Sequence, residues 1–295
     1  MEATDFFSIS FILSFLISSL RVSVPLIFAS QAGLLSERSG IVQIGLEGFM
    51  LIGAFSAASF AHYYQSSYVG FGMAFLMGSF FSFLFSLFVI KFKADQIVIG
   101  TAFNLLIAGL IPFISKFLFN STGSTPSLPI EIRLSVIPIL LAFLAVILIH
   151  LWLYHFRSGY WVQFAGEHPE TLLSAGVSVD KVRYICLALC GGVAALGGAS
   201  LSLFLSSNYS PLMTGGRGFI ALSAVILGKW KPIPTLLACL LFGILDALQI
   251  RLQGVIIGDF KIPVQWIQIL PYLLTIIILA GLFGKSKAPA FLGKK

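Results

Sequence analysis

Residues 134–155 read LSVIPILLAFLAVILIHLWLYH and contain no acidic residue, lysine or arginine. An α-helix needs about 20 apolar residues to cross the roughly 30 Å hydrocarbon layer of a bilayer. Similar runs recur at residues 41–61, 68–90, 97–119, 182–205, 233–252 and 262–284, with a shorter apolar piece at 218–228. This spacing predicts an all-α, polytopic transmembrane helical bundle and not a β-barrel, whose strands alternate over about 10 residues.

The composition also indicates a membrane protein. Of the 295 residues, 58% are hydrophobic and 10% charged, whereas soluble domains carry charge on roughly a quarter of their residues. Residues 6–35 form one apolar stretch that is interrupted by Arg21 and Pro25, which predicts either one long tilted helix or two short ones. We therefore expect a single transmembrane domain over residues 1–295, with about nine or ten crossings and one broken or short helix.

Basic residues indicate the orientation, because lysine and arginine are enriched on the cytoplasmic side of membrane proteins. When the tail from Lys285 is cytoplasmic, alternation of the crossings puts most basic residues inside. The net charge of +7 then reflects topology, and no binding of nucleic acid is predicted. Arg21 is unassigned, and the residues left outside are Lys116, Arg133, Arg217, Arg251 and Lys261.

Signals for chemistry within the chain are weak. Cys186, Cys190 and Cys239 lie inside apolar runs without the spacing of metal ligands, so no metal site is predicted. Gly284-Lys285-Ser286 resembles the end of a P-loop, but Leu279 stands where the first glycine is needed. We expect no ATP hydrolysis by this chain alone and no intramembrane enzyme, since His, Asp, Ser and Cys do not converge on one place.

Polar residues inside the apolar segments are candidates for a substrate pathway, because charged groups at membrane depth are rare and costly. Glu47 lies early in the second segment, where an interfacial position is the alternative. Asp246 lies near the middle of a later segment, where a serine, a backbone group or Arg251 could pair with it. Uncharged polar side chains suit a neutral solute better than a proton relay. The candidate pathway comprises Gln43, Glu47, Asn104, Asn208 and Asp246.

Two glycine clusters support this choice. Gly40, Gly45, Gly48 and Gly53 form one cluster, and Gly215, Gly216 and Gly218 form the other. Both lie where apolar segments are short or broken, and broken helices near the midplane are typical of substrate sites in transporters.

The longest polar stretch is Arg157–Lys181, RSGYWVQFAGEHPETLLSAGVSVDK, which the orientation places in the cytosol. Proline at a first helical position and a glycine stop predict a two-turn helix over 168–176. Leu172 and Leu173 would project from it with no internal core to cover, which favours a partner's groove; a helix on the membrane surface is the alternative. Ser178 or Asp180 could cap the next transmembrane helix.

Four runs stand out when they are taken together. They are GLLSERSGIVQIGLEGFMLIGAFSA (Gly33–Ala57), ADQIVIGTAFNLLIAGL (Ala94–Leu110), the polar stretch, and GGRGFIALSAVILGKWKPIPTLLACLLFGILDALQ (Gly215–Gln249). Together they resemble the permease subunits of bacterial ABC importers for nucleosides, simple sugars and riboflavin, within the branched-chain amino acid permease family. The similarity spans nearly the whole chain. Ala94–Val98 looks more like the nucleoside and riboflavin branch than the sugar branch, whereas Gln43 stands where asparagine is common.

The resemblance implies a type II ABC importer fold in the bacterial inner membrane, and the basic residues predict a cytoplasmic C-terminus. It implies a cytosolic ATPase subunit, a second homologous permease, an extracytoplasmic substrate-binding protein and membrane lipid as partners. ATP and Mg²⁺ would bind to the ATPase, and no cofactor would bind to this chain. Nucleosides are the first candidate solutes, followed by riboflavin and simple sugars. An autonomous transporter driven by an ion gradient is the alternative from a different class.

The resemblance also implies that a coupling segment, about residues 157–181, docks into the ATPase. Relatives usually carry Asn-Pro, then Ala-Ala, then Ala-Gly-Ile in this segment. Proline and glycine are retained here, but the contact residues differ, so a docking role with altered partner specificity is expected. The implied coupling residues are Glu167, His168, Pro169, Glu170, Thr171, Leu172, Leu173, Ala175 and Gly176.

Overall fold

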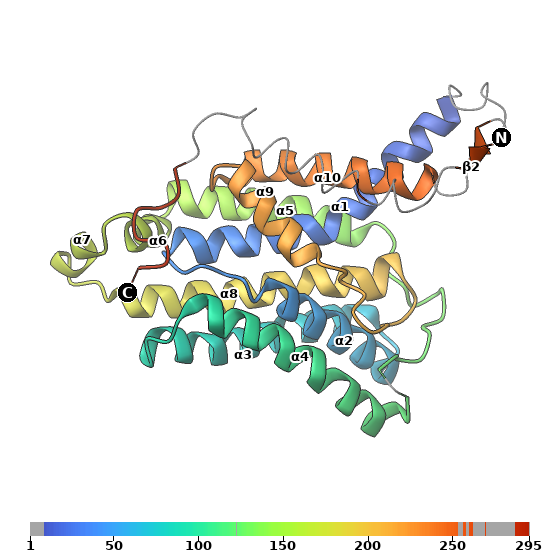
Figure 1. Cartoon of the computed structure of the whole chain (residues 1–295), viewed down its shortest axis with the longest axis horizontal. Coiled ribbons are helices and arrows are strands. Elements are labelled where there is room, and N and C mark those ends of the chain that lie inside the picture. Colours follow the sequence, from blue (N-terminus) through green and yellow to red (C-terminus); the bar gives the residue numbers. More distant parts are fainter. Residues whose placement is uncertain are drawn as a thin grey trace.

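The computed structural model describes residues 9–121, 123–252, 256–257, 260–261, 269 and 287–294. Long helices lie side by side along one axis (Figure 1). Six helices of the described part are long and apolar enough to cross a membrane, which confirms the all-α transmembrane bundle. They are α1 (Ile9–Arg38), α3 (Ser67–Ser86), α4 (Gln96–Phe119), α5 (Ile137–His155), α8 (Val179–Ser200) and α10 (Pro232–Leu252).

Shorter elements complete the fold. The π-helical turns η2 (Leu87–Lys91) and η3 (Leu201–Leu205) extend α3 and α8. Helices α6 (Arg157–Glu167) and α7 (Pro169–Ser174) form one end of the bundle, where the C-terminus also lies (Figure 1). Strands β1 (Ile256–Ile257) and β2 (Phe260–Lys261) form a small antiparallel pair, with Ile256 opposite Lys261.

The first apolar stretch is one helix. Pro25 lies inside α1, and the residues around it are fully buried. Helix α8 approaches closely there, since a Cβ at Gly197 would lie 2.8 Å from the Pro25 carbonyl oxygen. The two-helix alternative for residues 6–35 is therefore not the one adopted over the described residues.

Two elements differ from a simple crossing. Helix α2 (Leu46–Tyr64) begins five residues later than the predicted segment 41–61 and is almost entirely buried in the bundle. Helix α9 (Arg217–Leu227) has 11 residues and so spans about 16 Å, roughly half the hydrocarbon layer. It is the short helix that the sequence predicted. The predicted crossing at 262–284 lies outside the described residues, apart from Ile269.

Helix α8 occupies the centre of the bundle because its small residues admit two neighbours. A Cβ at Gly191 would lie 2.3 Å from the Gly78 carbonyl oxygen of α3, and one at Gly198 would lie 1.8 Å from the Met50 carbonyl oxygen of α2. Such close approach replaces the hydrophobic drive that is missing between helices in lipid. The small residues of α8 therefore let α2 and α3 pack closely against it.

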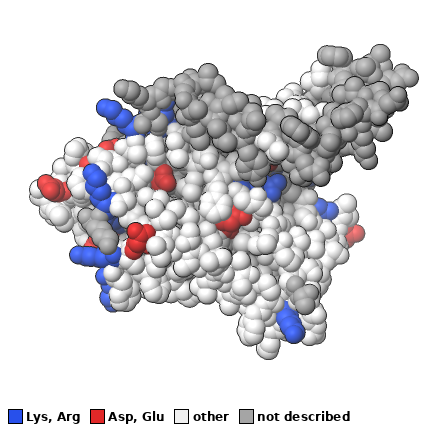
Figure 2. All heavy atoms as spheres, viewed as in Figure 1, with Lys and Arg blue, Asp and Glu red and all other residues white. Residues whose placement is uncertain are grey.

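Charged residues are unevenly distributed over the molecule. Figure 2 shows lysine and arginine side chains gathered at the end that carries α7, whereas the described part of the visible flank is mostly uncharged. An uncharged flank suits contact with lipid, and a basic end suits the cytoplasmic interface.

Candidate functional site

The connection between α1 and α2, residues 39–45, is not helical, although it is largely buried. We call it the buried connection. Its backbone N–H and C=O groups lack the hydrogen bonds that a helix would have supplied. Side chains of α4 provide some of these hydrogen bonds instead. Gln96 Oε1 accepts the Val42 N–H at 2.8 Å, and Asn104 Nδ2 donates to the Ile44 carbonyl oxygen at 2.9 Å. Asn104 Oδ1 also accepts the Gly48 N–H at 2.8 Å.

Gln43 lies at the centre of the buried connection and is fully buried. Its Nε2 is 3.6 Å from the Cys190 sulfur, and its Oε1 has no hydrogen-bond partner among the described residues. An unsatisfied buried acceptor is costly. Gln43 therefore retains an unused hydrogen-bonding group among the described residues.

Glu47 joins α2 to the start of α9. Its Oε1 accepts the Gly216 N–H at 2.8 Å and the Thr214 hydroxyl, and its Oε2 accepts the Gly218 N–H at 2.8 Å. A carboxylate is stabilising at a helix N-terminus, where backbone N–H groups lack partners. Glu47 thus has hydrogen-bond partners within the bundle. We call Glu47, Thr214, Gly216 and Gly218 the α2–α9 junction.

The glycines of this junction are required by its geometry. Gly216 has φ of +81°, a left-handed conformation that favours glycine. A Cβ at Gly218 would lie 2.5 Å from the Glu47 backbone nitrogen. The structure therefore places Gly216 and Gly218 against Glu47, which lies between Gly45 and Gly48 in the chain.

Asp246 is linked to the same region through Arg217. Its Oδ2 is 4.0 Å from Arg217 Nη2, and both side chains are largely buried. The ion-pair partner of Asp246 is therefore Arg217. Arg251, the partner considered from the sequence, instead donates a hydrogen bond to Ser14 Oγ at 2.8 Å. Arg217, expected in an outer loop, begins α9, where its guanidinium also approaches the Met213 and Thr214 carbonyl oxygens.

Asn208 lies apart from these residues, in the loop between η3 and α9. Its side chain accepts from Ser206 Oγ at 3.4 Å and donates to the Tyr209 carbonyl oxygen at 3.3 Å. No hydrogen bond between described residues joins it to Glu47 or Asp246. The structure thus brings four of the five predicted pathway residues to the buried connection or the start of α9.

The coupling segment has the predicted local structure. Pro169 occupies the first turn of α7, and Gly176 has φ of +74° with its N–H donated to the Leu173 carbonyl oxygen at 3.0 Å. Ser178, and not Asp180, caps α8 by accepting the Lys181 N–H at 3.4 Å. The predicted short helix is confirmed.

The expectation that both leucines project is wrong for Leu172. Its side chain is 2% exposed and packs with Val162, Val179 and Val182, whereas Leu173 is 63% exposed. Consecutive residues of a helix point about 100° apart, so a helix resting on α6 and α8 hides one of them. The exposed coupling residues are His168, Glu170, Thr171, Leu173, Ala175 and Gly176.

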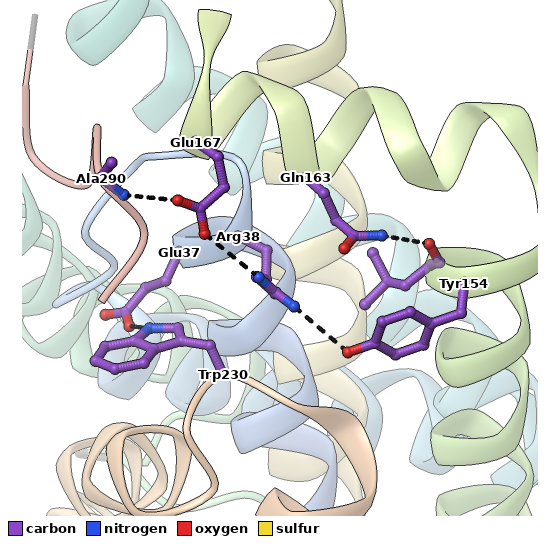
Figure 3. A network of polar contacts seen from close by, with 8 residues as sticks. Glu37, Arg38, Tyr154, Gln163, Glu167, Trp230 and Ala290 are labelled. Atoms are coloured by element: carbon purple, nitrogen blue, oxygen red, sulfur yellow. Dashed lines mark hydrogen bonds and ion pairs between the residues drawn. The ribbon is translucent and has the colours of Figure 1, made fainter. Parts of the chain in front are cut away.

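Glu167 faces a polar network behind α7 (Figure 3). Its Oε1 is 3.7 Å from Arg38 Nη1, and its Oε2 accepts the Ala290 N–H at 3.1 Å. Arg38 Nη2 also donates to the Tyr154 hydroxyl at 3.4 Å. Glu167 therefore joins α6 to the end of α1 and to the C-terminal tail.

Several members of this network were missed by sequence reasoning. Trp230 Nε1 donates to the Glu37 carboxylate, which joins the α9–α10 turn to α1 (Figure 3). Arg183 of α8 donates to the Ser39 carbonyl oxygen at 3.2 Å and to the Ala165 carbonyl oxygen at 3.4 Å. Two features of the sequence could have indicated these contacts, namely the arginine at the end of α1 and the Lys-Trp-Lys sequence around Trp230.

Residues 15–279 match the family described as the permease component of the branched-chain amino acid transport system. The chain is 36% identical to the nucleoside ABC transporter permease NupC of Lactococcus lactis, covering 90% of this chain and 91% of that protein. It is 34% identical to the guanosine ABC transporter permease NupQ of Bacillus subtilis, covering 92% of each. It is 33% identical to TsgC13 of Haloferax volcanii, a candidate glucose ABC transporter permease, covering 83% and 79%.

Proposed function

The chain belongs to the family of permease components of branched-chain amino acid transport systems, and we propose that it is the membrane subunit of an ABC importer that takes up nucleosides. A permease of this class is not itself an enzyme, since a separate subunit hydrolyses ATP. The observation that carries the choice of solute is the identity of 36% and 34% to two permeases named for nucleoside and guanosine transport, over at least 90% of this chain.

Other solutes remain as alternatives. A simple sugar is supported by the 33% identity to TsgC13, and riboflavin rests only on the resemblance noted from the sequence. An autonomous ion-coupled transporter has less support, because its two candidate carboxylates have internal partners. Glu47 accepts hydrogen bonds at the start of α9, and Asp246 pairs with Arg217.

The exposed face of α7 is the proposed docking surface for the ATPase. It carries one large apolar side chain, Leu173, among polar neighbours. This assignment puts the α7 end of the bundle in the cytosol, and with it the C-terminal tail, which lies at the same end. Glu167 would act behind this surface through Arg38, and ATP and Mg²⁺ would bind to the ATPase.

The solute would pass near the buried connection and the α2–α9 junction. Both are non-helical or helix-terminal structures inside a bundle, as is typical of sites in transporters. Gln43 offers an amide oxygen without a partner among the described residues, which suits a neutral solute with N–H or O–H donors. Glu47, Asn104 and Asp246 would support this region, and Asn208 would lie on the outer approach.

The remaining partners follow from the same class of importer. We propose a second, homologous permease beside this one and an extracytoplasmic binding protein that delivers the solute, all in or at the bacterial inner membrane. The described residues show no cluster of His, Cys, Asp and Glu able to hold a metal ion, and none is proposed.

Uptake by the whole importer tests the proposal. The chain is reconstituted in proteoliposomes with the proposed ATPase, second permease and binding protein, and uptake of labelled guanosine, riboflavin and ribose is compared. We expect ATP-dependent uptake of guanosine alone. Uptake of only riboflavin or ribose would reassign the solute, and uptake by the chain alone under a sodium or proton gradient would contradict the ABC class.

A further inference from the structure

The C-terminal residues 287–294, which we call the strap, contact two functional segments at once. The Phe291 N–H donates to the Gly166 carbonyl oxygen at 2.8 Å, and the Ala290 N–H donates to Glu167 Oε2 at 3.1 Å, both at the end of α6. The Gly293 N–H donates to the Gly40 carbonyl oxygen at 3.0 Å, at the start of the buried connection. The strap thus joins the coupling segment to the chain that leads to Glu47.

Side chains hold the strap in place. Pro289 is buried, and half-buried Leu292 packs against the apolar cluster that contains Leu35, Leu153 and Leu172. The strap therefore shares a core with the inner face of α7. Movement of α7 would reach the strap through this core as well as through the hydrogen bonds of α6.

Beneath the strap, the end of α6 and the buried connection are in direct contact. A Cβ at Gly40 would lie 3.3 Å from the Ala165 carbonyl oxygen, and one at Gly166 would lie 3.1 Å from the Gly40 backbone nitrogen. Arg183 binds the Ser39 and Ala165 carbonyl oxygens, one on each side of this contact. The end of α6 and the buried connection are thus held together by three separate parts of the chain, namely α8, the strap and α1.

We propose that the strap makes the coupling segment and the buried connection move as one body, so that displacement of α7 is transmitted to Glu47 and the start of α9. This inference rests on the proposed function, because an ATPase would supply the displacement. The strap itself does not bind the ATPase in this proposal. Its contacts within the chain are what matter.

The first test needs no partner protein. Hydrogen–deuterium exchange is measured on the full chain in lipid nanodiscs, for the wild type, Phe291→Pro and Leu292→Asp. Phe291→Pro removes the N–H that binds Gly166, and Leu292→Asp disrupts the packing. We expect exchange about tenfold faster in peptides covering residues 36–45 and 163–168, as suits the loss of a hydrogen bond with its packing.

Two controls accompany this experiment. Lys287→Ala changes an exposed residue at the start of the strap and should leave exchange unchanged. Peptides from α3 should exchange as in the wild type in every variant, which shows that the bundle is folded. If residues 36–45 exchange at the wild-type rate in both strap variants while α3 is intact, the inference is overturned.

The second test uses the complete importer. For the same variants, we measure solute molecules taken up per ATP hydrolysed, together with co-purification of the ATPase. We expect this ratio to fall several-fold, about fivefold or more, while the ATPase stays bound, since a contact worth roughly 1 kcal/mol shifts an equilibrium by about that factor. A wild-type ratio would overturn the inference, and so would loss of the ATPase, because the strap would then be a docking surface.

The two proposals can fail separately. If the wild-type chain never binds an ATPase, the proposed function fails, whereas the exchange experiment still decides whether the strap holds residues 36–45. If the ATPase binds through α7 and transport is unaffected by the strap variants, only the inference about the strap fails.

Discussion

The Glu47 carboxylate of α2 accepts the backbone N–H of Gly218 at 2.8 Å, at the start of α9. The two residues are 171 positions apart in the chain. A side chain from one broken segment thereby supplies the missing partner at the end of a short helix. Opening or closing a path between α2 and α9 would require this contact to change, so it is the first place to test.

Glu47→Gln should weaken the junction without changing its shape. The amide keeps one acceptor oxygen, so one of the bonds to Gly216 and Gly218 is lost together with the charge that favours a helix N-terminus. We expect a loss of about 1 to 2 kcal/mol in stability and reduced uptake, measured by thermal unfolding in detergent and by the transport assay. Glu170→Gln, on an exposed residue, is the control for stability. Unchanged melting of Glu47→Gln would mean that the carboxylate does not support α9.

Gly218→Ala tests the closeness of the same contact. The new Cβ would lie 2.5 Å from the Glu47 nitrogen, so α2 and α9 must separate, which costs about 1 to 3 kcal/mol. Gly109→Ala in α4 is the matched control, because a Cβ there meets nothing within 4 Å and alanine favours a helix by about 1 kcal/mol. We expect Gly218→Ala to unfold at a lower temperature and Gly109→Ala at an equal or higher one. Equal melting of both variants would contradict the described packing.

The variants Leu172→Asp and Leu173→Asp should have different effects. The first should affect the stability of the coupling segment, and the second should affect docking of the ATPase. The buried Leu172 packs on α6 and α8, so a carboxylate there should destabilise the coupling segment by about 2 to 5 kcal/mol. Leu173 is exposed, so its substitution should leave the melting temperature unchanged while ATPase co-purification and uptake fall. The measurements are thermal unfolding and a pull-down from the reconstituted importer. Retained ATPase binding by Leu173→Asp would remove the support for docking through α7.

Local features of the coupling segment could be predicted because each depends on a few adjacent residues. Proline sets its own φ at the start of α7, and Gly176 provides the left-handed stop. The burial of Leu172 depends on the positions of α6 and α8 and is a tertiary property. The same limit applies to the start of α2, because helical propensity gives no sign that Gln96 and Asn104 support a non-helical connection before it.

Only part of the candidate site could be predicted, because some of its features are local and others depend on contacts between distant residues. Glycine clusters and intramembrane carboxylates pointed to the region where α2 meets α9, since both are unusual in a helix surrounded by lipid. Their partners were not predicted. Gly216 lies 169 positions from Glu47, and no spacing rule joins residues so far apart. The hydrogen bonds of the strap left no signal in the sequence, because backbone N–H groups, which nearly every residue has, donate them.

Variants of the Asp246–Arg217 ion pair can show whether the pair has a structural role or a role in ion coupling. Asp246→Asn leaves the largely buried Arg217 without its ion-pair partner, and Arg217→Gln leaves Asp246 without its own. Leaving one member of this partly buried pair without its partner costs about 1 to 3 kcal/mol, whereas neutral residues at both positions cost far less. We therefore expect each single variant to melt lower than the Asp246→Asn/Arg217→Gln double variant, in a double-mutant cycle of thermal stability. Nucleoside uptake should recover in the double variant if the pair only holds α9 against α10. Failure of uptake to recover despite restored stability would show that one of the charges acts in transport itself.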